Sequence, residues 1–377
     1  QNLSLGARYF AGNTFRYRGG KGTTGTHYDL ALVDGGYTAD IDYLSQNVAL
    51  FAENLFSLSD RFIVIPGVRY EYLFAEAGGY SGVVNGSPVP LVAQQRGRSF
   101  LLAGLGMEYA VTQNARLYAN ATQSYRPVQF ADLTTPPTTD VIDPNLTDAS
   151  GLNIDLGLRG EQGDWLVFDV SLFHLDYKNR VGTIKQQRQD GTFYNLRTNV
   201  GASSASGLEA FTEFNLTRAA GRPRSQGAWS IYTSYAYTNA RYADLKVVTV
   251  LNNTLVETNY KNNRVEYAPE HVFRSGISFT WGGFSANVQL SYTSGVFADA
   301  NNTQDPTPNA QNGFIPGYTL ADITACYRHK SGWLVKGGLN NLTDESYFTR
   351  RAGGYPGPGV LPGDGRTGFL TLGYALP

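Results

Sequence analysis

The sequence predicts an all-β protein, a transmembrane antiparallel β-barrel with about 14 strands of ~10 residues each. Three observations support this fold class. Apolar and polar residues alternate with a period of two in one segment after another, and short turns alternate with long loops between these segments. The composition, with 25 Tyr, 20 Phe and 43 Gly against one Met, favours strands and turns over helices.

The alternation separates an apolar face from a polar face in each predicted strand. In the segment 62–72, Val68, Tyr70 and Tyr72 fall on one face, while Arg69 and Glu71 fall on the other. Three further segments divide in the same way, and their apolar faces comprise Leu101, Ala103, Leu105, Met107, Tyr109 and Val111; Leu152, Ile154, Leu156 and Leu158; and Phe284, Ala286, Val288, Leu290 and Tyr292. A barrel strand between lipid and a polar interior requires this pattern. A soluble β-sandwich would show the same alternation, so periodicity alone leaves both architectures open.

The lengths of the connections favour the barrel. Short turns are predicted near Ser59-Asp60, Thr112-Gln113-Asn114, Gln162-Gly163, Gly282-Gly283 and Lys330-Ser331-Gly332. Long loops are predicted over residues 15–43, 73–97, 124–150, 178–204, 240–269, 294–317 and 344–366. Short turns on one side and long loops on the other are typical of outer-membrane barrels, whereas soluble hairpins usually have loops of ~2–5 residues. The basic stretch 218–227 is an exception on the short-turn side.

The aromatic residues and the absence of long apolar runs agree with a membrane barrel. No apolar run approaches the ~18 residues of a membrane helix, so a chain that crosses a bilayer here must do so as a closed sheet. Tryptophans lie at predicted short-turn ends and tyrosines near long-loop ends, as aromatic belts require; these are Trp165, Trp281, Trp333, Tyr72, Tyr177, Tyr237 and Tyr292. Ordinary strand aromatics would explain part of this pattern.

The last segment, from Trp333 to Leu376, contains the most specific pattern in the chain. An apolar strand is followed by Asn340-Asn341-Leu342-Thr343-Asp344, a Gly/Pro-rich loop at 353–359, Gly365-Arg366 and an alternating strand. This order resembles the C-terminal end of TonB-dependent outer-membrane receptors, and its details are similar to the ferric-dicitrate type. Other blocks resemble the family in the same order: Phe51-Ala52-Glu53-Asn54, Pro66-Gly67-Val68-Arg69-Tyr70-Glu71, Tyr118-Ala119-Asn120-Ala121, Tyr125-Arg126-Pro127, Gly157-Leu158-Arg159, Gly207-Leu208-Glu209 and Tyr267-Ala268-Pro269-Glu270-His271. Thr147-Asp148 stands where the family pattern has Pro-Glu.

The resemblance implies that residues 1–377 are the C-terminal portion of a receptor barrel in the outer membrane of a Gram-negative bacterium. Members of the family have roughly 22 strands around a plugged lumen, so about eight strands, the plug domain and the TonB box would be missing from this chain. Gln1 to Leu5 read as a strand and not as a signal peptide, which also suggests a start inside a larger precursor. Expected partners are a ferric siderophore or citrate chelate, TonB through the plug, membrane lipid and lipopolysaccharide. We expect a monomer.

Arginines near the long loops are the candidate substrate-binding residues, because guanidinium groups bind the carboxylates of an anionic ferric chelate bidentately. The candidates are Arg16, Arg18, Arg96, Arg98, Arg126 with Gln129, Arg350 and Arg351. The alternative for each is contact with lipopolysaccharide phosphate or with solvent. Two inward pairs, Arg69 with Glu71 and Arg159 with Asp155, are expected to form ion pairs inside the barrel.

Other motifs give little support for an enzyme or a cofactor. Gly20-Lys21-Gly22-Thr23-Thr24-Gly25 fits G-x-G-x-x-G but lacks a following helix. The stretch 299–305 has oxygen ligands at calcium-loop spacing but lacks the central Gly and the closing Glu. The four His are scattered, no Ser/His/acid set has a supporting motif, and the lone Cys326 cannot form an internal disulfide. The net charge of −1 gives no reason to expect nucleic-acid binding.

The sequence therefore predicts a receptor without catalytic activity and without a resident metal or cofactor, which imports a ferric siderophore or a ferric citrate-like chelate with energy from TonB. The alternatives are a passive porin, a TonB-dependent importer of cobalamin or a glycan, and a β-rich binding protein outside membranes.

Overall fold

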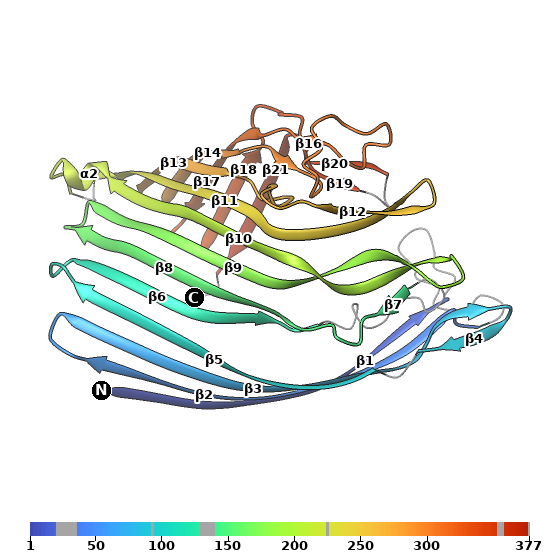
Figure 1. The fold of residues 1–377 in the computed structure, drawn as a ribbon. Helices are drawn as coiled ribbons and strands as arrows, with labels where there is room; N and C mark the ends of the chain where they lie inside the picture. Colours follow the sequence, from blue (N-terminus) through green and yellow to red (C-terminus); the bar gives the residue numbers. More distant parts are fainter. Residues whose placement is uncertain (20–35, 92–93, 129–139, 224–225, 353–357, 376–377) are drawn as a thin grey trace.

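The protein is built around one curved antiparallel sheet of 17 strands (Figure 1). The computed structural model describes residues 1–19, 36–91, 94–128, 140–223, 226–352 and 358–375. Within the described chain, the other regular elements are two small two-stranded sheets and one short helix. The all-β fold class predicted from the alternation is confirmed.

The strands of the large sheet are β1 (Asn2–Arg18), β2 (Ala39–Ser57), β3 (Phe62–Val84), β4 (Ser87–Pro90), β5 (Gln94–Ala110), β6 (Ala115–Arg126), β7 (Asp140–Ile142), β8 (Ala149–Gln162), β9 (Leu166–Gln187), β10 (Phe193–Asn215), β11 (Ala228–Leu251), β12 (Thr254–Asn259), β13 (His271–Trp281), β14 (Phe284–Thr293), β17 (Tyr318–Arg328), β18 (Trp333–Asn340) and β21 (Thr367–Tyr374). The small sheets are β15 (Val296–Phe297) with β16 (Phe314–Ile315), and β19 (Phe348–Ala352) with β20 (Gly359–Pro362).

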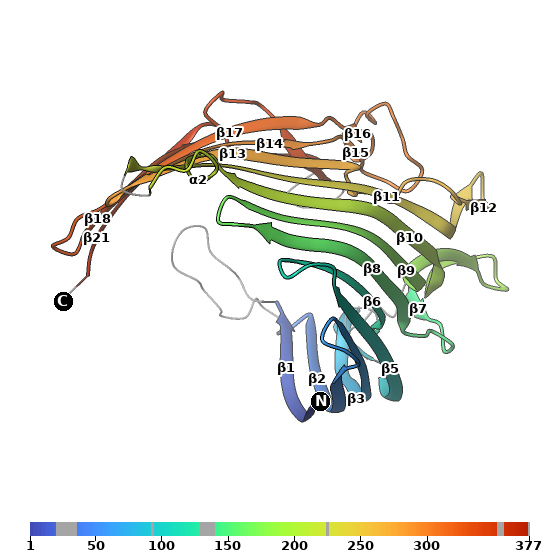
Figure 2. The ribbon, with the colours of Figure 1, turned by 90° about the vertical axis from the view of Figure 1, so that its left-hand side faces the viewer.

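Fourteen strands of the large sheet, which we call the wall, each pair with the next of these strands along the chain. The pairing runs β1–β2–β3–β5–β6–β8–β9–β10–β11–β13–β14–β17–β18–β21. Three short strands, β4, β7 and β12, extend the sheet beyond this wall on the loop side. The described chain therefore has fourteen wall strands, as the sequence predicts. Figure 2 shows that the sheet curls into a trough, with β1 and β21 as its two margins.

The positions of the short turns are confirmed, but several strands are much longer than ~10 residues. β3, β9, β10 and β11 have 23, 22, 23 and 24 residues, so large parts of the predicted loops 73–97, 178–204 and 240–269 are strand. These hairpins continue past the wall on the loop side, where apolar residues gather in small local clusters instead of covering one whole face. Ladder hydrogen bonds persist there without a two-residue hydropathy period, so the pattern that predicts strands fades before the strands end.

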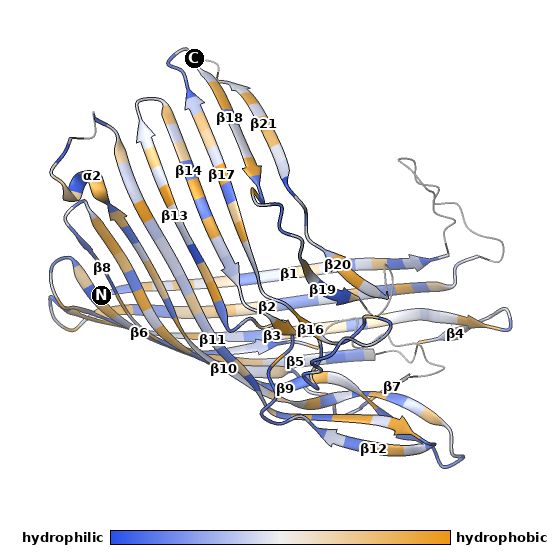
Figure 3. Ribbon diagram, turned by 90° about the horizontal axis from the view of Figure 1, so that it is seen from above, coloured by the Kyte–Doolittle hydropathy of each residue, from blue (hydrophilic) through white to orange (hydrophobic). Residues whose placement is uncertain are grey.

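The polar face of the sheet is the concave one. On this face curvature brings side chains together across an intervening strand. The Tyr125 hydroxyl of β6 donates to Glu71 of β3 at 2.9 Å, and the Tyr118 hydroxyl of β6 donates to Asp169 of β9 at 2.8 Å. The opposite, convex face carries exposed apolar residues such as Leu101, which is 63% exposed. The alternation is visible along the strands in Figure 3.

One of the two predicted interior ion pairs is confirmed and the other is wrong. Arg69 forms an ion pair with Glu71. Arg159 contacts Glu108 of β5 at 2.7 Å instead of Asp155, and Arg116 contacts the same carboxylate. Residues four apart on one strand are separated by ~13 Å, which is beyond the reach of an ion pair. The register instead places Arg116 opposite Arg159, and Glu108 neutralises both.

Aromatic side chains gather at the turn-side ends of the last strands. Trp281 of β13 and Trp333 of β18 are 60% and 54% exposed. The ring of Trp333 packs on Tyr374 of β21, with centroids 5.0 Å apart. Amphipathic rings favour the boundary between hydrocarbon and water, so this arrangement agrees with the predicted aromatic belt.

The exceptional basic turn between β10 and β11 contains the short helix α2 (Leu216–Ala219). Asn215 caps it by accepting a hydrogen bond from the Arg218 amide at 3.0 Å. The Arg218 guanidinium reaches Asp164 in the neighbouring turn at 2.9 Å, so a basic residue of this turn links it to the next one. In the described part of the chain, the structure has no helix that is long and apolar enough to cross a membrane.

Buried apolar clusters lie on the loop side, where the long hairpins pack on each other. Ile41, Tyr43 and Ala77 form one cluster in the β2–β3 hairpin. Val128 and Leu146 form the second, with Val181 packed against it. A third cluster comprises Val200, Tyr242 and Leu245. The loop-side extensions are therefore packed structure, and they hold the side chains of the candidate site in place.

Candidate ligand-binding site

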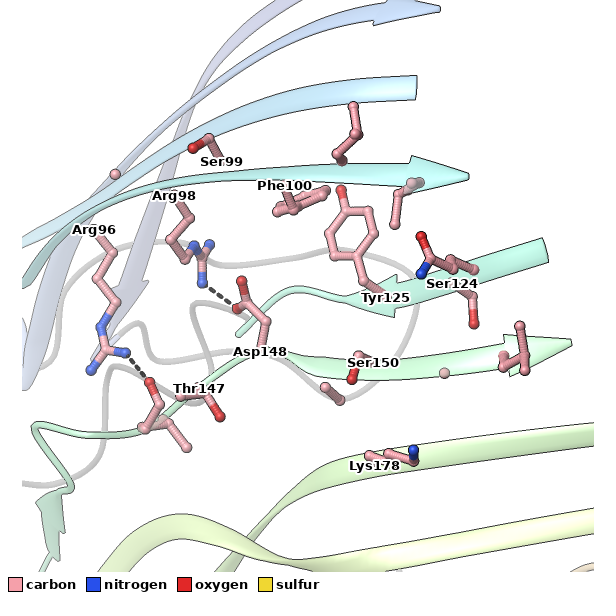
Figure 4. A pocket seen from close by; sticks show the side chains of 18 of the residues that line it. Arg96, Arg98, Ser99, Phe100, Ser124, Tyr125, Thr147, Asp148, Ser150 and Lys178 are labelled. Carbon is pink, nitrogen blue, oxygen red and sulfur yellow. Dashed lines mark hydrogen bonds and ion pairs between the residues drawn. The ribbon is translucent and has the colours of Figure 1, made fainter. Parts of the chain in front are cut away.

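A pocket lies where β5 and β6 separate on the loop side (Figure 4). The pairing of these strands ends at Gly104 and Thr122. Beyond that point β5 stays on β3 as far as Gln94, while β6 stays on β8 as far as Arg126. The opening between them leads to a cavity of about 1220 Å³.

Two predicted arginines from β5 line this pocket. Arg96 donates from Nη1 to the carbonyl oxygen of Leu146 at 2.7 Å, and Arg98 donates from Nη1 to Asp148 Oδ1 at 2.6 Å (Figure 4). Both partners belong to the segment before β8. Burial and the neighbouring Arg98 lower the pKa of the Arg96 guanidinium from its ordinary value, although it remains charged at neutral pH.

The segment 143–148, which we call the strap, is also held from the opposite side. Thr198 of β10 donates its hydroxyl to Asp143 Oδ2 at 2.5 Å, while the side chain of Asn199 accepts from the Thr147 amide at 2.9 Å. Asn199 also donates to the Thr147 carbonyl at 3.0 Å. Within the strap, Leu146 is 4% exposed and anchors the second apolar cluster. The strap therefore spans from β10 to the two arginines of β5.

The floor of the pocket is aromatic and connects to the interior of the trough. The rings of Tyr125 and Phe100 pack with centroids 3.8 Å apart. The Tyr125 hydroxyl and the Asn47 amide both donate to Glu71 Oε2 at 2.9 Å, and Arg69 pairs with the same carboxylate. Side chains from three strands, β2, β3 and β6, thus fix the position of one buried carboxylate beneath the pocket.

The charge of the pocket suits an anion. Its charged lining residues in the described chain are Arg96, Arg98 and Lys178, against the single carboxylate of Asp148. Guanidinium groups offer planar pairs of donors to carboxylates, and a partly desolvated site strengthens such contacts. The arrangement can therefore hold a ligand with several carboxylate groups.

The other predicted residues are not brought into this pocket. Arg16 is exposed in the loop-side half of β1. Arg18 donates to Thr38 Oγ1 and to the Ser81 carbonyl, both at 3.1 Å, and so connects β1 to its neighbours. Arg126 ends β6 near the pocket without lining it. Gln129 lies outside the described residues, and so does the glycine motif at 20–25.

Arg350 and Arg351 of β19 have different surroundings. Arg350 is exposed and lies over the ring of Tyr267, 5.5 Å from its centroid. Arg351 is 7% exposed and donates to the carbonyl oxygens of Gly313, Ala310 and Phe314 at 3.1, 3.1 and 3.0 Å. The guanidinium of Arg351 therefore holds the loop before β17 against β19.

Several pocket residues lie outside the sequence prediction. Asp148, Lys178 and the aromatic floor of Phe100 and Tyr125 belong to the site only through the fold. The available signal was the substitution of Thr147-Asp148 for the Pro-Glu pair of the family pattern, which marks this segment as different.

A serine, a histidine and a carboxylate come together on the convex face, although no local motif predicts such a set. His174 Nδ1 lies 2.7 Å from Ser206 Oγ, and its Nε2 lies 3.3 Å from Asp176 Oδ1. The three residues sit on β9 and β10, inside continuous ladders with flanking strands. Backbone N–H groups in such ladders are already paired, so the face offers no oxyanion hole, and the set lacks what acyl transfer requires.

Metal ligation has little support among the described residues, which contain no cluster of three His, Cys, Asp or Glu side chains able to hold an ion. In the stretch with calcium-loop spacing, Asp299 Oδ1 accepts from the Thr303 hydroxyl at 2.9 Å. Asn302 instead binds Arg264 in the neighbouring segment, accepting from its amide and donating to its carbonyl.

A family model described as "TonB dependent receptor-like, beta-barrel" matches residues 1–342. An uncharacterized TonB-dependent receptor of Haemophilus influenzae is 29% identical over 196 residues, which cover 52% of this chain and 49% of that protein.

Two solved structures share the fold at low sequence identity. The unliganded ferric citrate transporter FecA aligns with a TM-score of 0.74 at 20% identity, over 99% of this chain and 51% of that chain. The closed form of the ferric-catecholate import receptor Fiu from Escherichia coli K12 aligns with a TM-score of 0.71 at 20% identity, over 99% and 51%. The chain thus spans about half the length of each relative.

Proposed function

The chain belongs to the TonB-dependent receptor β-barrel family. We propose that it forms the wall and the ligand-binding vestibule of an outer-membrane receptor that imports an anionic ferric chelate. Receptors of this family are transporters, not enzymes. The cargo in this proposal is a carboxylate-bearing siderophore or ferric citrate-like complex, and the energy for import comes through TonB.

The observation that carries the proposal is the cationic pocket in the loop-side wall. Arg96 and Arg98 present donors to a cavity of about 1220 Å³, and Lys178 adds a third positive charge. This volume exceeds the ~300–1,000 Å³ of ordinary small-molecule sites, which leaves room for a metal ion inside its chelating shell. The relatives FecA and Fiu, named for ferric citrate and ferric catecholates, agree with such a cargo.

The proposal also states what each surface of the protein contacts. The convex apolar face contacts membrane lipid, and the exposed loop-side arginines, among them Arg16, contact lipopolysaccharide phosphate. The receptor acts as a monomer in the outer membrane of a Gram-negative bacterium. It supplies no chemistry to the chelate.

The first test is binding of ferric citrate to cells that lack other ferric-chelate receptors and express this one. Replacing both arginines (Arg96→Gln, Arg98→Gln) should weaken binding of radiolabelled ferric citrate by about 10- to 100-fold, since two charge-assisted contacts are lost. A control with Arg188→Gln and Arg241→Gln removes the same charge from the loop side outside the pocket and should leave binding unchanged. Equal binding by both double variants would overturn the proposed site.

The second test separates active import from passive diffusion. Ferric citrate is supplied at a concentration too low for measurable diffusion through a porin. Its uptake should then stop in a strain without TonB, while its binding to outer membranes from that strain should persist. Uptake that continues without TonB would favour the porin alternative.

A further inference from the structure

We propose that Asp148 is an internal competitor of the ligand, whose carboxylate occupies Arg98 until a ligand carboxylate replaces it and frees the strap. This inference rests on the proposed function, because it assigns the specificity and the regulation of the same pocket.

The contact between Arg98 and Asp148 leaves part of the guanidinium unused. Asp148 Oδ1 accepts from Arg98 Nη1 at 2.6 Å and also from the Val128 amide at 2.8 Å. Arg98 Nε is buried and has no hydrogen-bond partner. Both side chains of the pair are only 18% exposed. A buried donor without a partner is costly, and a carboxylate that approaches side-on can satisfy Nε and Nη together.

The strap therefore holds the site in an incompletely bonded state that a better ligand can improve. A carboxylate of the chelate that binds Arg98 side-on gains the bond that Asp148 does not make. The released Asp148 keeps its acceptor bond to the Val128 amide, so its displacement does not leave that amide unpaired.

The same exchange applies to the second arginine. Arg96 donates to a backbone carbonyl of the strap, that of Leu146, and a carboxylate is a stronger acceptor for a guanidinium than a neutral carbonyl. A ligand with two free carboxylates replaces both strap contacts at once. A ligand with one leaves the strap attached through the other arginine, so the pocket selects chelates with at least two free carboxylates.

The strap stays tethered on its far side when these contacts exchange. Thr198 and Asn199 of β10 bind Asp143 and Thr147, whereas the two arginines bind Leu146 and Asp148. Ligand binding therefore releases the strap from β5, while its contacts with β10 and with Val128 act as a hinge. Movement of the strap therefore makes the occupancy of the pocket detectable at the loop-side surface of the receptor.

The central test is Asp148→Asn, assayed by equilibrium binding of ferric citrate to outer-membrane vesicles that contain the receptor. Asparagine keeps the shape and the oxygen that accepts from Val128 but removes the charge that competes for Arg98. Affinity should rise by about fivefold. The matched control is Asp190→Asn, which removes the same charge from the loop side outside the pocket, at an exposed carboxylate that accepts from the Thr192 hydroxyl. Its affinity should stay unchanged.

The outcomes separate this inference from the proposed function. If Asp148→Asn binds no better while Arg98→Gln binds worse, Asp148 does not compete and the pocket assignment stands. If Arg98→Gln also has no effect, the proposed function fails. Equal gains in Asp148→Asn and Asp190→Asn would attribute the effect to overall charge and would contradict a competing role for Asp148. A neutral ferric trihydroxamate should bind all of these variants alike.

Release of the strap has its own readout. Spin labels at Asn145→Cys and Gln189→Cys, in a Cys326→Ser background, measure the distance between the strap and the tip of the β9–β10 hairpin. Gallium citrate, which is diamagnetic, should broaden or shift this distance. An unchanged distribution at saturating gallium citrate would overturn the release of the strap.

Discussion

At the scale of single residues, one buried carboxylate organises the polar side of the trough beneath the pocket. Glu71 is 6% exposed and accepts from Asn47 and Tyr125 while it pairs with Arg69. Its partners come from two other strands, β2 and β6, and from its own strand β3. A buried charge of this kind is costly to leave unpaired, so its loss should affect several elements together.

We expect Glu71→Gln to lower the free energy of unfolding by about 2–4 kcal/mol, because it leaves the charge of Arg69 without a partner. The measurement is the temperature at which the folded, fast-migrating band is lost in heat-modifiability gels. Glu53→Gln is the control, since Glu53 lies on the next strand and is exposed. A similar shift for both variants would contradict a special role for Glu71.

The adjacent pair Arg350 and Arg351 provides a second comparison between residues. Arg351→Gln removes three buried hydrogen bonds and should loosen the loop before β17, with a local loss of about 2–3 kcal/mol. Arg350→Gln changes an exposed side chain and should not loosen it. Limited proteolysis of the stretch 299–313 measures the effect. Equal cleavage of the two variants would contradict the structural role of Arg351.

The sequence singles out the two arginines of the candidate pocket but not their partners, and the reason is distance along the chain. Arg96 and Arg98 can be placed at a loop-side strand end from the local alternation alone. Asp148 and Lys178 join them only after β5, β6, β8 and β9 have assembled in register. No spacing rule connects residues separated by several strands. Arg351 resembled a loop arginine for the same reason, since its carbonyl partners lie in a different loop.

At the scale of elements, the wall strands show which parts of a strand the sequence predicts. The alternation in the sequence matches the structure along the part of each wall strand that has one apolar and one polar face. The loop-side continuations of β9 and β10, for example Thr183 to Gln187 paired with Phe193 to Arg197, are held by the ladder without such a contrast. The turn-side ends were predicted well because short turns leave few ways to connect two strands.

The motif Gly207-Leu208-Glu209 has a physical explanation in β10. A Cβ at Gly207 would overlap the Tyr237 carbonyl oxygen and the ring of Phe173. Gly207→Ala should therefore disturb the β9–β10–β11 register and reduce the amount of folded protein in outer membranes by several-fold. Gly337→Ala is the control, because its Cβ meets only ordinary contacts at 3.4 and 3.7 Å. Normal assembly of both variants would contradict this explanation.

At the scale of the whole molecule, the division into a lipid face and an interior face can be tested with a single charge. Leu156 lies in the middle of β8 on the convex face and is 47% exposed. Leu156→Arg should cost about 2–4 kcal/mol if this face meets hydrocarbon, and little if it meets water. Asn153→Arg introduces the same charge on the concave face of β8 and should be tolerated. Unfolding by urea in detergent micelles or lipid vesicles gives both values.

The separation of β5 from β6 has a mechanical consequence for the receptor. Along the stretch from Gln94 to Ala103, the described backbone ladder of β5 runs along β3 and not along β6. Gln123 of β6 supplies one substitute by accepting from the Ala103 amide at 2.9 Å. A strand that is hydrogen-bonded to a neighbour on both edges resists shear, whereas a strand paired along one edge can bend without unfolding its neighbours. We therefore expect the amide hydrogens from Gln94 to Ala103 to exchange with solvent sooner than those of β9. The most flexible part of the wall is thus expected beside Arg96 and Arg98, the two arginines proposed to bind the cargo.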